Sequence, residues 1–255
     1  MAKNNLFERK MKEDKKEESL GDTLKTVVFA IAIAILIRSF LFEPFRIPSG
    51  SMYPTLEVGD YLFVSKYTYG YSKHSFPFSM HLFDGRIWYD EPERGDIVVF
   101  KYPKDNSTDY IKRIIGLAGD KIKLVDGRVY VNGEILPREQ IEDYVIADNA
   151  NNAGVYPQYI ETLPNGVKHK IVEISDNAPL DNMEEVTVPE GHFFMMGDNR
   201  DRSDDSRANV GFVPAENLVG KARVLFFSYG DNGVWYNPLS WGKKFRWNRF
   251  FSKIK

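Results

Sequence analysis

The chain has 255 residues, 43% of them hydrophobic, which is enough to build one or two modest globular cores. Its 34 basic residues nearly balance its 36 acidic residues, so no long-range electrostatic field favours a nucleic-acid partner. The lack of cysteine excludes disulfides, thiolate metal sites and cysteine nucleophiles, and the four scattered histidines exclude a His-Glu-x-x-His zinc site. We therefore expect no metal or other cofactor, and chemistry based on Ser, Lys, Asp, Glu or Tyr.

The amino-terminal part of the chain changes abruptly from charged to apolar. Residues 1–23 carry many charges of both signs and predict a solvated tail. The apolar run that follows predicts a transmembrane anchor over residues 24–43, in which Arg38 extends its guanidinium to the lipid headgroups. A helix buried in a soluble core is the alternative, because residues 26–37 alone would cover only about 18 Å.

The sequence around this run also predicts its fate and its orientation. Residues 38–44 lack the small residues of a signal-peptide cleavage site, so we expect the anchor to be retained. Many basic residues precede the run and only Arg46 follows it closely, so the positive-inside rule predicts a cytoplasmic amino terminus. The basic residues that precede the run are Lys3, Arg9, Lys10, Lys12, Lys15, Lys16 and Lys25.

Beyond the anchor, frequent strand signals and scarce helical periodicity predict a mainly β fold. Asp126-Gly127, between the β-prone runs 121–125 and 128–131, predicts a tight hairpin. Farther on, loop signals at 149–152, 165–166 and 181–182 surround one more expected strand, residues 170–174.

This pattern predicts a division of the body into two parts. We expect a smaller β region at 120–188, inserted into a catalytic β domain formed by 44–119 and 189–255. The basic and aromatic residues 241–255 suit either contact with a membrane surface or a packed terminal segment.

Ser51 lies in the first of three segments that could carry chemistry, PSGSMYPTL at residues 48–56. Taken alone, Ser-Gly-Ser between two prolines is typical of a turn. The segment lacks the Gly-x-Ser-x-Gly pattern of α/β hydrolases, so a catalytic role for Ser51 requires a base from elsewhere.

The second segment, DYIKRIIG at residues 109–116, predicts a strand on which Lys112 and Arg113 point to opposite faces. Desolvation would lower the lysine pKa from its usual value of about 10.4 and leave a neutral amine able to accept a proton. Arginine does not deprotonate in proteins. If a base for Ser51 exists here, it is Lys112; an ordinary surface lysine is the alternative.

The third segment, GDNRDRSDDSR at residues 197–207, follows an apolar run. It superficially suggests a calcium loop, but neither the glycine nor the closing glutamate of an EF-hand has the required position. An ion pair between Asp205 and Arg207 is the structural interpretation.

Together with RGDIVVFKYP at residues 94–103, and in this order, these segments resemble type I signal peptidase, the bacterial leader peptidase of peptidase family S26. The resemblance runs from about residue 20 onward. It implies a membrane-bound serine endopeptidase that removes signal peptides from exported preproteins after Ala-x-Ala sites. It also implies a catalytic domain on the outer, periplasmic side of the inner membrane. Preproteins and membrane lipid are the partners it suggests, with the protein-export machinery as a further candidate.

The resemblance assigns roles to individual residues. Ser51 would be the nucleophile and Lys112 the general base, while the Ser49 hydroxyl and the Ser51 N–H would form the oxyanion hole. Ser203 would orient the lysine amine, and the pair Asp205 and Arg207 would be structural. The substrate-binding residues would be Phe45, Ile47, Met52, Leu56, Tyr110 and Ile111. Tyr53 departs from the commoner pattern of the family and could alter the rim of the pocket.

Two other functions compete with this interpretation. A membrane-tethered binding protein could have kept the fold without hydrolysis, although the presence of both Ser51 and Lys112 disfavours it. A penicillin-binding type transferase would need Ser-x-x-Lys with companion motifs. That spacing occurs only at Ser240 with Lys243 and at Ser252 with Lys255, without those motifs.

Overall fold

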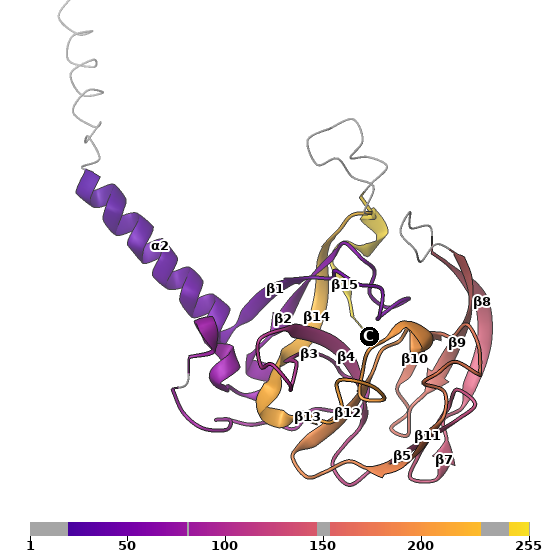
Figure 1. Ribbon diagram of the computed structural model, residues 1–255. Helices are drawn as coiled ribbons and strands as arrows, with labels where there is room; N and C mark the ends of the chain where they lie inside the picture. The colour runs from indigo at the N-terminus through magenta and orange to yellow at the C-terminus, as the bar shows by residue number, and fades with distance from the viewer. Residues whose placement is uncertain (1–19, 81, 147–153, 231–244, 255) are drawn as a thin grey trace, which may run out of the picture.

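A computed structural model describes residues 20–80, 82–146, 154–230 and 245–254. One long helix, α2 (Leu20–Phe40), projects from a β-rich body (Figure 1). The prediction of a mainly β protein with an amino-terminal helix is therefore confirmed. Most of the charged tail, the expected loop at 149–152 and Trp241 lie outside the described residues.

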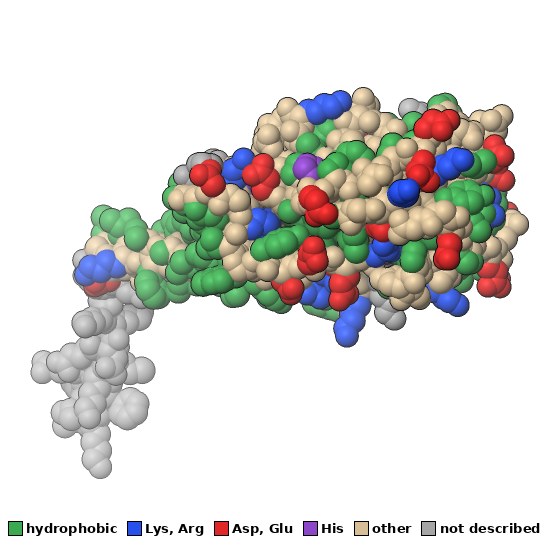
Figure 2. Space-filling model, turned by 90° about the horizontal axis from the view of Figure 1, so that it is seen from below, with side chains coloured by type: hydrophobic (Ala, Val, Ile, Leu, Met, Phe, Trp, Pro, Cys, Tyr) green, Lys and Arg blue, Asp and Glu red, His purple; other side chains and the backbone are tan. Residues whose placement is uncertain are grey.

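Helix α2 is long and apolar enough to cross a membrane. Its 21 residues rise about 32 Å, close to the roughly 30 Å of a hydrocarbon core. None of its apolar window is buried inside the protein, which contradicts the alternative of a soluble core helix. Figure 2 shows the hydrophobic side chains that cover the projecting helix.

The helix ends at Phe40, earlier than the anchor limit expected from the sequence, because residues 42 and 43 already belong to strand β1. Glu43 precedes Pro44, and the residue before a proline is disfavoured in the helical conformation. The helix end is tied to the body through Arg38, whose Nε donates to Glu43 Oε1 at 2.8 Å.

The main sheet joins segments from both halves of the chain. It has eight antiparallel strands in the order β1-β2-β14-β3-β4-β12-β13, with β15 also paired to β14. The late strand β14 is thus inserted between the early strands β2 and β3. The strands are β1 (Phe42–Arg46), β2 (Asp60–Ser65), β3 (Ile97–Lys101), β4 (Asp109–Gly116), β12 (His192–Met196), β13 (Val213–Pro214), β14 (Leu218–Ser228) and β15 (Ser252–Lys253).

The intervening residues form two smaller sheets, with the orders β11-β5-β6-β7 and β10-β9-β8. The predicted hairpin is confirmed: Asp126 and Gly127 both have positive φ, 46° and 71°, as a tight hairpin turn requires. The strands are β5 (Lys121–Val125), β6 (Arg128–Val131), β7 (Glu134–Ile135), β8 (Arg138–Ile146), β9 (Gly154–Thr162), β10 (Lys168–Val172) and β11 (Met183–Thr187). The division into domains stays a prediction.

Strands β8, β9 and β11 were not expected, since only the run at 170–174 was recognised as a strand between Pro137 and Pro189. Strands β8 and β11 are rich in polar residues, as in REQIEDYVI of β8, and most β8 side chains are partly or fully exposed, whereas β9 is interrupted by Pro157. Strand β9 pairs with both β8 and β10, and this pairing stabilises strands that the hydrophobic pattern of the sequence does not predict. Short 3-10 helices lie at η1 (Tyr67–Tyr69), η2 (Lys73–Ser75), η3 (Pro77–Ser79), η4 (Arg200–Arg202), η5 (Ala215–Asn217) and η7 (Trp247–Arg249).

The carboxyl-terminal residues 245–254 pack against β14. The ring of Phe227 lies 5.4 Å from that of Phe245 and 5.3 Å from that of Phe250, and Arg249 forms an ion pair with Asp60 at 2.5 Å. The described part is therefore a packed terminal segment, although Trp247 is still 61% exposed.

Candidate active site

Ser51 and Lys112 are in direct contact. Ser51 lies in the loop between β1 and β2, and Lys112 in the middle of β4. Lys112 Nζ donates a hydrogen bond to Ser51 Oγ at 2.8 Å and another to the Ile111 carbonyl at 3.0 Å. Lys112 is only 3% exposed, so it is not the surface lysine of the alternative interpretation.

The position of β4 explains the electrostatics of this lysine. Strands β3 and β12 flank β4 in the sheet, and this burial lowers the pKa of Lys112 to about 8, while the charges of Asp205, Asp204 and Asp198 act to raise it. With that pKa, about a tenth of the amines are neutral at pH 7. Lys112 can therefore accept a proton from Ser51 under ordinary conditions.

A residue that the sequence analysis overlooked, Asn199, holds the serine loop in place. Its side chain donates to the Gly50 carbonyl at 3.0 Å, and its backbone N–H donates to the Ser51 carbonyl at 3.1 Å. Gly197, two residues earlier, touches the same loop: a Cβ there would collide with the Ser51 carbonyl and the Ser203 side chain. These contacts bring the loop after β12 against the serine.

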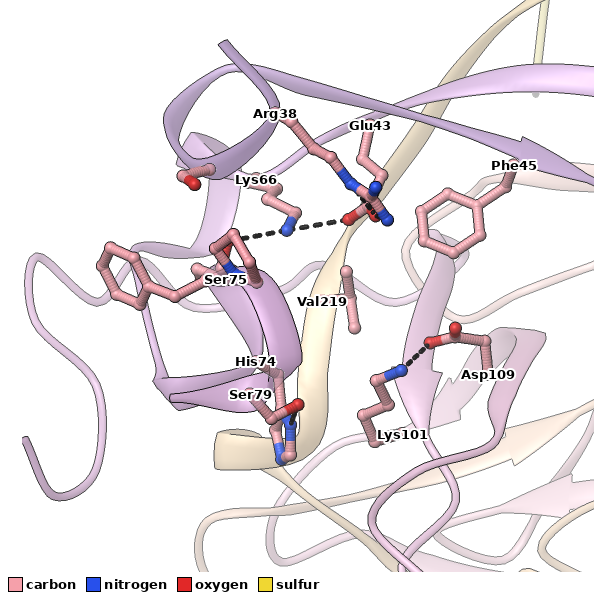
Figure 3. Close-up of a pocket in the computed structure, with 13 residues that line it drawn as sticks. Arg38, Glu43, Phe45, Lys66, His74, Ser75, Ser79, Lys101, Asp109 and Val219 are labelled. Atoms are coloured by element: carbon pink, nitrogen blue, oxygen red, sulfur yellow. Dashed lines mark hydrogen bonds and ion pairs between the residues drawn. The ribbon is translucent and has the colours of Figure 1, made fainter. Parts of the chain in front are cut away.

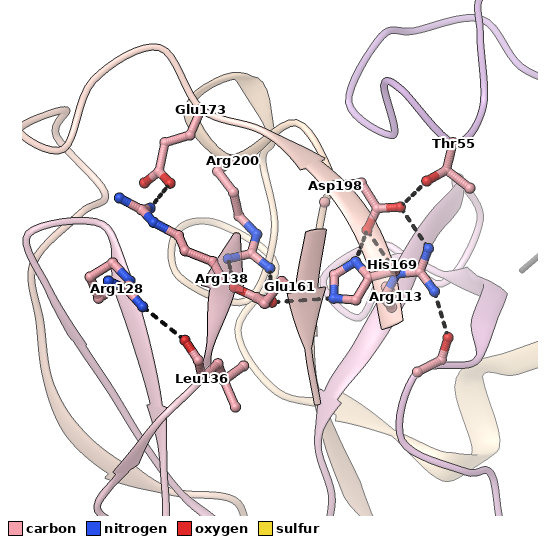
Figure 4. Close-up of polar contacts among 12 residues, drawn as sticks. Thr55, Arg113, Arg128, Leu136, Arg138, Glu161, His169, Glu173, Asp198 and Arg200 are labelled. Atoms are coloured by element: carbon pink, nitrogen blue, oxygen red, sulfur yellow. Dashed lines mark hydrogen bonds and ion pairs between the residues drawn. The ribbon is translucent and has the colours of Figure 1, made fainter. Parts of the chain in front are cut away.

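The loop after β12 is in turn anchored by a buried ion pair on the other face of β4 (Figure 4). Arg113 donates to both carboxylate oxygens of Asp198, at 2.8 and 2.7 Å, and Thr55 Oγ1 donates to Asp198 at 2.5 Å. Burial acts to raise the pKa of Asp198, but the Arg113 guanidinium outweighs it and holds that pKa well below its usual range. Asp198 is therefore an ionised partner of Arg113.

The same network extends into the three-stranded sheet. His169 of β10 places its Nδ1 3.5 Å from Asp198 Oδ1 and its Nε2 3.2 Å from Glu161 Oε2. Glu161 of β9 also accepts hydrogen bonds from both terminal nitrogens of Arg200 in η4. Residues from the small sheet thus support the segment that contacts Ser51 (Figure 4).

A cleft of about 400 Å³ lies beside the Ser51–Lys112 pair. Of the predicted site residues, Ser49, Ser51, Tyr110, Ile111 and Lys112 line it. The other lining residues are Pro48, Gly50, Asp109, Asn199, Arg202 and Asp204.

Four of the predicted substrate-binding residues lie elsewhere. Ile47, Met52 and Leu56 are 2% exposed or less and belong to the core beneath the sheet, where they pack with Ile111. The structure thus places these three side chains in the core, where burial of such apolar side chains contributes about 1.5–3 kcal/mol each, and not along the cleft. Phe45 lines a separate polar cavity of about 130 Å³ at the base of α2 (Figure 3).

Tyr53 does not reach the rim of the cleft either. Its side chain is 4% exposed, and its ring lies 6.0 Å from that of Tyr144 in β8. Tyr53, which departs from the commoner family pattern, thus packs against the three-stranded sheet.

Ser203 and the acidic residues after it surround Lys112 without all contacting it. Within the described part of the chain, the expected contact of Ser203 with the lysine amine is not formed; its side chain instead acts on Asp205, whose pKa it helps to lower. Asp205 accepts from the Gly197 N–H at 2.9 Å and from Arg207 Nη2 at 2.9 Å. This pair therefore fixes the start of the loop that carries Asn199.

The fold and the site define a membrane-anchored serine peptidase. The model of the family "Signal peptidase, peptidase S26" matches residues 20–227, and the chain belongs to that family. Signal peptidase I of Rickettsia prowazekii (strain Madrid E) is 44% identical over 243 residues, which cover 89% of this chain and 90% of that relative. Signal peptidase I of Rickettsia typhi (strain ATCC VR-144 / Wilmington) is 41% identical, covering 94% and 96%. The chain is therefore a bacterial hydrolase that processes signal peptides.

A crystal structure of a signal peptidase I from Enterococcus faecalis V583 is also similar to this chain, with 32% sequence identity and a TM-score of 0.31. The match covers 52% of this chain and 97% of that one.

Proposed function

We propose that this chain cleaves signal peptides from exported preproteins with a Ser51/Lys112 dyad. The observation that carries the proposal is the 2.8 Å hydrogen bond from Lys112 Nζ to Ser51 Oγ, formed by a buried lysine with a lowered pKa. A binding protein without hydrolytic activity would have no need to bury a lysine against a serine at the edge of a cleft.

The proposed reaction is acyl transfer. Neutral Lys112 accepts the Ser51 proton while Ser51 Oγ attacks the scissile carbonyl carbon, and the Ser51 N–H and the Ser49 hydroxyl donate to the developing oxyanion. The Lys112 ammonium then gives its proton to the leaving amine. Lys112 next accepts a proton from water, whose oxygen attacks the ester carbon. The Lys112 ammonium returns this proton to Ser51 Oγ as the ester bond breaks and the acid product leaves. In its ammonium form Lys112 keeps one acceptor, the Ile111 carbonyl.

The proposed specificity is for small residues, as in Ala-x-Ala. The cleft contains Tyr110 and Ile111 next to Ser51, and Tyr110 is fixed by stacking on Tyr102 at 5.0 Å between ring centroids. Ile47, Met52 and Leu56 would act indirectly, by holding the serine loop on the core. Ser203 would contact Lys112 only after a side-chain rotation.

The proposed setting is the outer face of the inner membrane, with a cytoplasmic amino terminus. The basic residues before α2 support this orientation. Because β1 follows α2 directly and leads into the Ser51 loop, the serine would work close to the lipid surface, where signal peptides of preproteins emerge. Membrane lipid and, beyond it, the protein-export machinery would be its neighbours. The tail 1–23, the inserted region 120–188 and the flanking catalytic parts would be its functional divisions.

Substitution of either dyad residue tests the mechanism. Ser51→Ala and Lys112→Met should each lower the rate of preprotein cleavage in detergent micelles by about 10³-fold or more, because dyad residues act as a unit. Ser107→Ala and Lys104→Ala, which change exposed residues outside the site, are matched controls and should cleave normally. Near-normal cleavage by either dyad variant would refute the assignment.

A further inference from the structure

Three carboxylates from separate segments meet at a point outside the Ser51 cleft. Glu173 follows β10, Asp181 lies in the loop before β11, and Asp201 belongs to η4. One carboxylate oxygen of each lies within 4.8 Å of the other two. Glu173 is 2% exposed and Asp181 is fully buried, so bulk water does not separate these groups.

Each of these carboxylates uses only one of its two oxygens to bind the protein. The donors are Arg138 to Glu173 Oε2, the Ala178 N–H to Asp181 Oδ2, and the Ile174 and Ser175 N–H groups to Asp201 Oδ2. The second oxygens, Glu173 Oε1, Asp181 Oδ1 and Asp201 Oδ1, are buried and accept no hydrogen bond from any described residue. Buried acceptors of this kind ordinarily have a partner, and carboxylates that meet in this way need a cation or a shared proton, as between Asp181 and Asp201.

The guanidinium groups closest to these carboxylates are shared with other acidic side chains. Arg138, the guanidinium in contact with Glu173, is shared with Asp176 at 2.7 Å, and Arg200 is bound to Glu161 (Figure 4). A bound cation would give the three unpaired oxygens a charged partner.

We propose that Glu173, Asp181 and Asp201 bind one hard divalent cation, Ca²⁺ in the first place. Ca²⁺ binds oxygen ligands at about 2.3–2.6 Å, so two of its ligands can lie up to about 5 Å apart, which accommodates the observed spacing. Mg²⁺, with bonds of about 2.0–2.1 Å, holds its ligands at most about 4.2 Å apart, so Ca²⁺ accommodates the whole range of separations up to 4.8 Å and Mg²⁺ only part of it. The hydrogen bonds to the other oxygens, Glu173 Oε2, Asp181 Oδ2 and Asp201 Oδ2, orient the three ligands, as the outer contacts of metal sites do.

Such an ion would tie the loop after β10 to η4. Helix η4 begins one residue after Asn199, which holds the carbonyls of Gly50 and Ser51. The cation would therefore stabilise the segment that supports the serine loop without touching the reacting atoms.

Calcium binding by the full-length chain tests this proposal. Protein in detergent micelles, stripped with EDTA and dialysed, is titrated calorimetrically with CaCl₂ up to about 1 mM, the weak end of protein calcium sites. We expect one Ca²⁺ per chain. In thermal unfolding, CaCl₂ at about a hundred times its Kd should raise Tm by about 5–10 °C. The absence of Ca²⁺ binding by the wild-type protein would overturn the proposal, and shared protons alone would then hold the three carboxylates together.

Variants locate the ion. Asp181→Asn and Asp201→Asn keep the hydrogen-bond acceptors but remove a charge, and each should weaken Ca²⁺ binding at least about tenfold. Glu184→Gln, an exposed residue near Asp181 in the chain, is the matched control and should bind as the wild type does. Equal Ca²⁺ binding by all four proteins would place the ion elsewhere and overturn the assignment. An equal Tm shift with MgCl₂ would overturn the choice of Ca²⁺.

Discussion

At the scale of single residues, Lys112 shows how a strand position changes the chemistry of a lysine. The alternation of side chains along β4 directs Lys112 to the serine loop and Arg113 to the buried Asp198. The proposed role of the lysine as a base depends on its burial in the sheet, which lowers its pKa, whereas the arginine remains an ion-pair partner because it does not deprotonate. Two neighbouring cations therefore have different roles on opposite faces of one strand.

The lowered pKa predicts the dependence of cleavage on pH. Only the neutral amine accepts the Ser51 proton, so kcat/KM should rise about tenfold from pH 6 to pH 7 and level off above a pKa of about 8. The measurement is a pH–rate profile with a soluble peptide substrate. Asp204→Asn removes a carboxylate whose charge raises the pKa of Lys112, so its profile should shift to lower pH. A profile that is flat from pH 6 to pH 7.5 would contradict the role of Lys112.

At the scale of elements, the site depends on a contact between β4 and the loop after β12. That loop reaches Ser51 through Asn199, and Asp198 fixes the loop to β4 through Arg113. Both partners of this ion pair are at most 1% exposed. The position of the serine loop is thus linked to the stability of the sheet.

Removal of one partner of this pair should be strongly destabilising. Asp198→Asn would leave the Arg113 guanidinium buried without a counter-charge and should lower the free energy of unfolding by about 3–5 kcal/mol. Denaturant unfolding followed by tryptophan fluorescence measures this change. The double variant Arg113→Met/Asp198→Met removes both charges and should recover much of the loss. A loss below about 1 kcal/mol in Asp198→Asn would show that the pair is not needed for stability.

At the scale of the whole molecule, the features that the sequence predicts are those determined by residues close together in the chain. The apolar helix, the hairpin at Asp126-Gly127 and the mainly β character of the body follow from local patterns, and the Ser51–Lys112 pair was suggested by a family resemblance. The insertion of β14 between β2 and β3, the contact of Asn199 with the serine loop and the meeting of three carboxylates arise only when distant segments pack together. For the same reason Met52 and Leu56, which look like pocket residues in a motif, are core residues in the fold.

The projecting helix predicts how the whole enzyme partitions into membranes. An aspartate near the middle of a membrane-spanning helix costs about 2.5–3.5 kcal/mol, so Ile31→Asp combined with Ile35→Asp should cost about 6 kcal/mol and release the chain from the membrane. Carbonate extraction of membranes, with immunoblotting of the pellet and the supernatant, measures the retained fraction. The same two aspartates at Gly21 and Thr23, which precede the apolar run, are the control and should leave the chain in the pellet. If the Ile31/Ile35 variant also stayed in the pellet, α2 would not be what holds this enzyme in the bilayer.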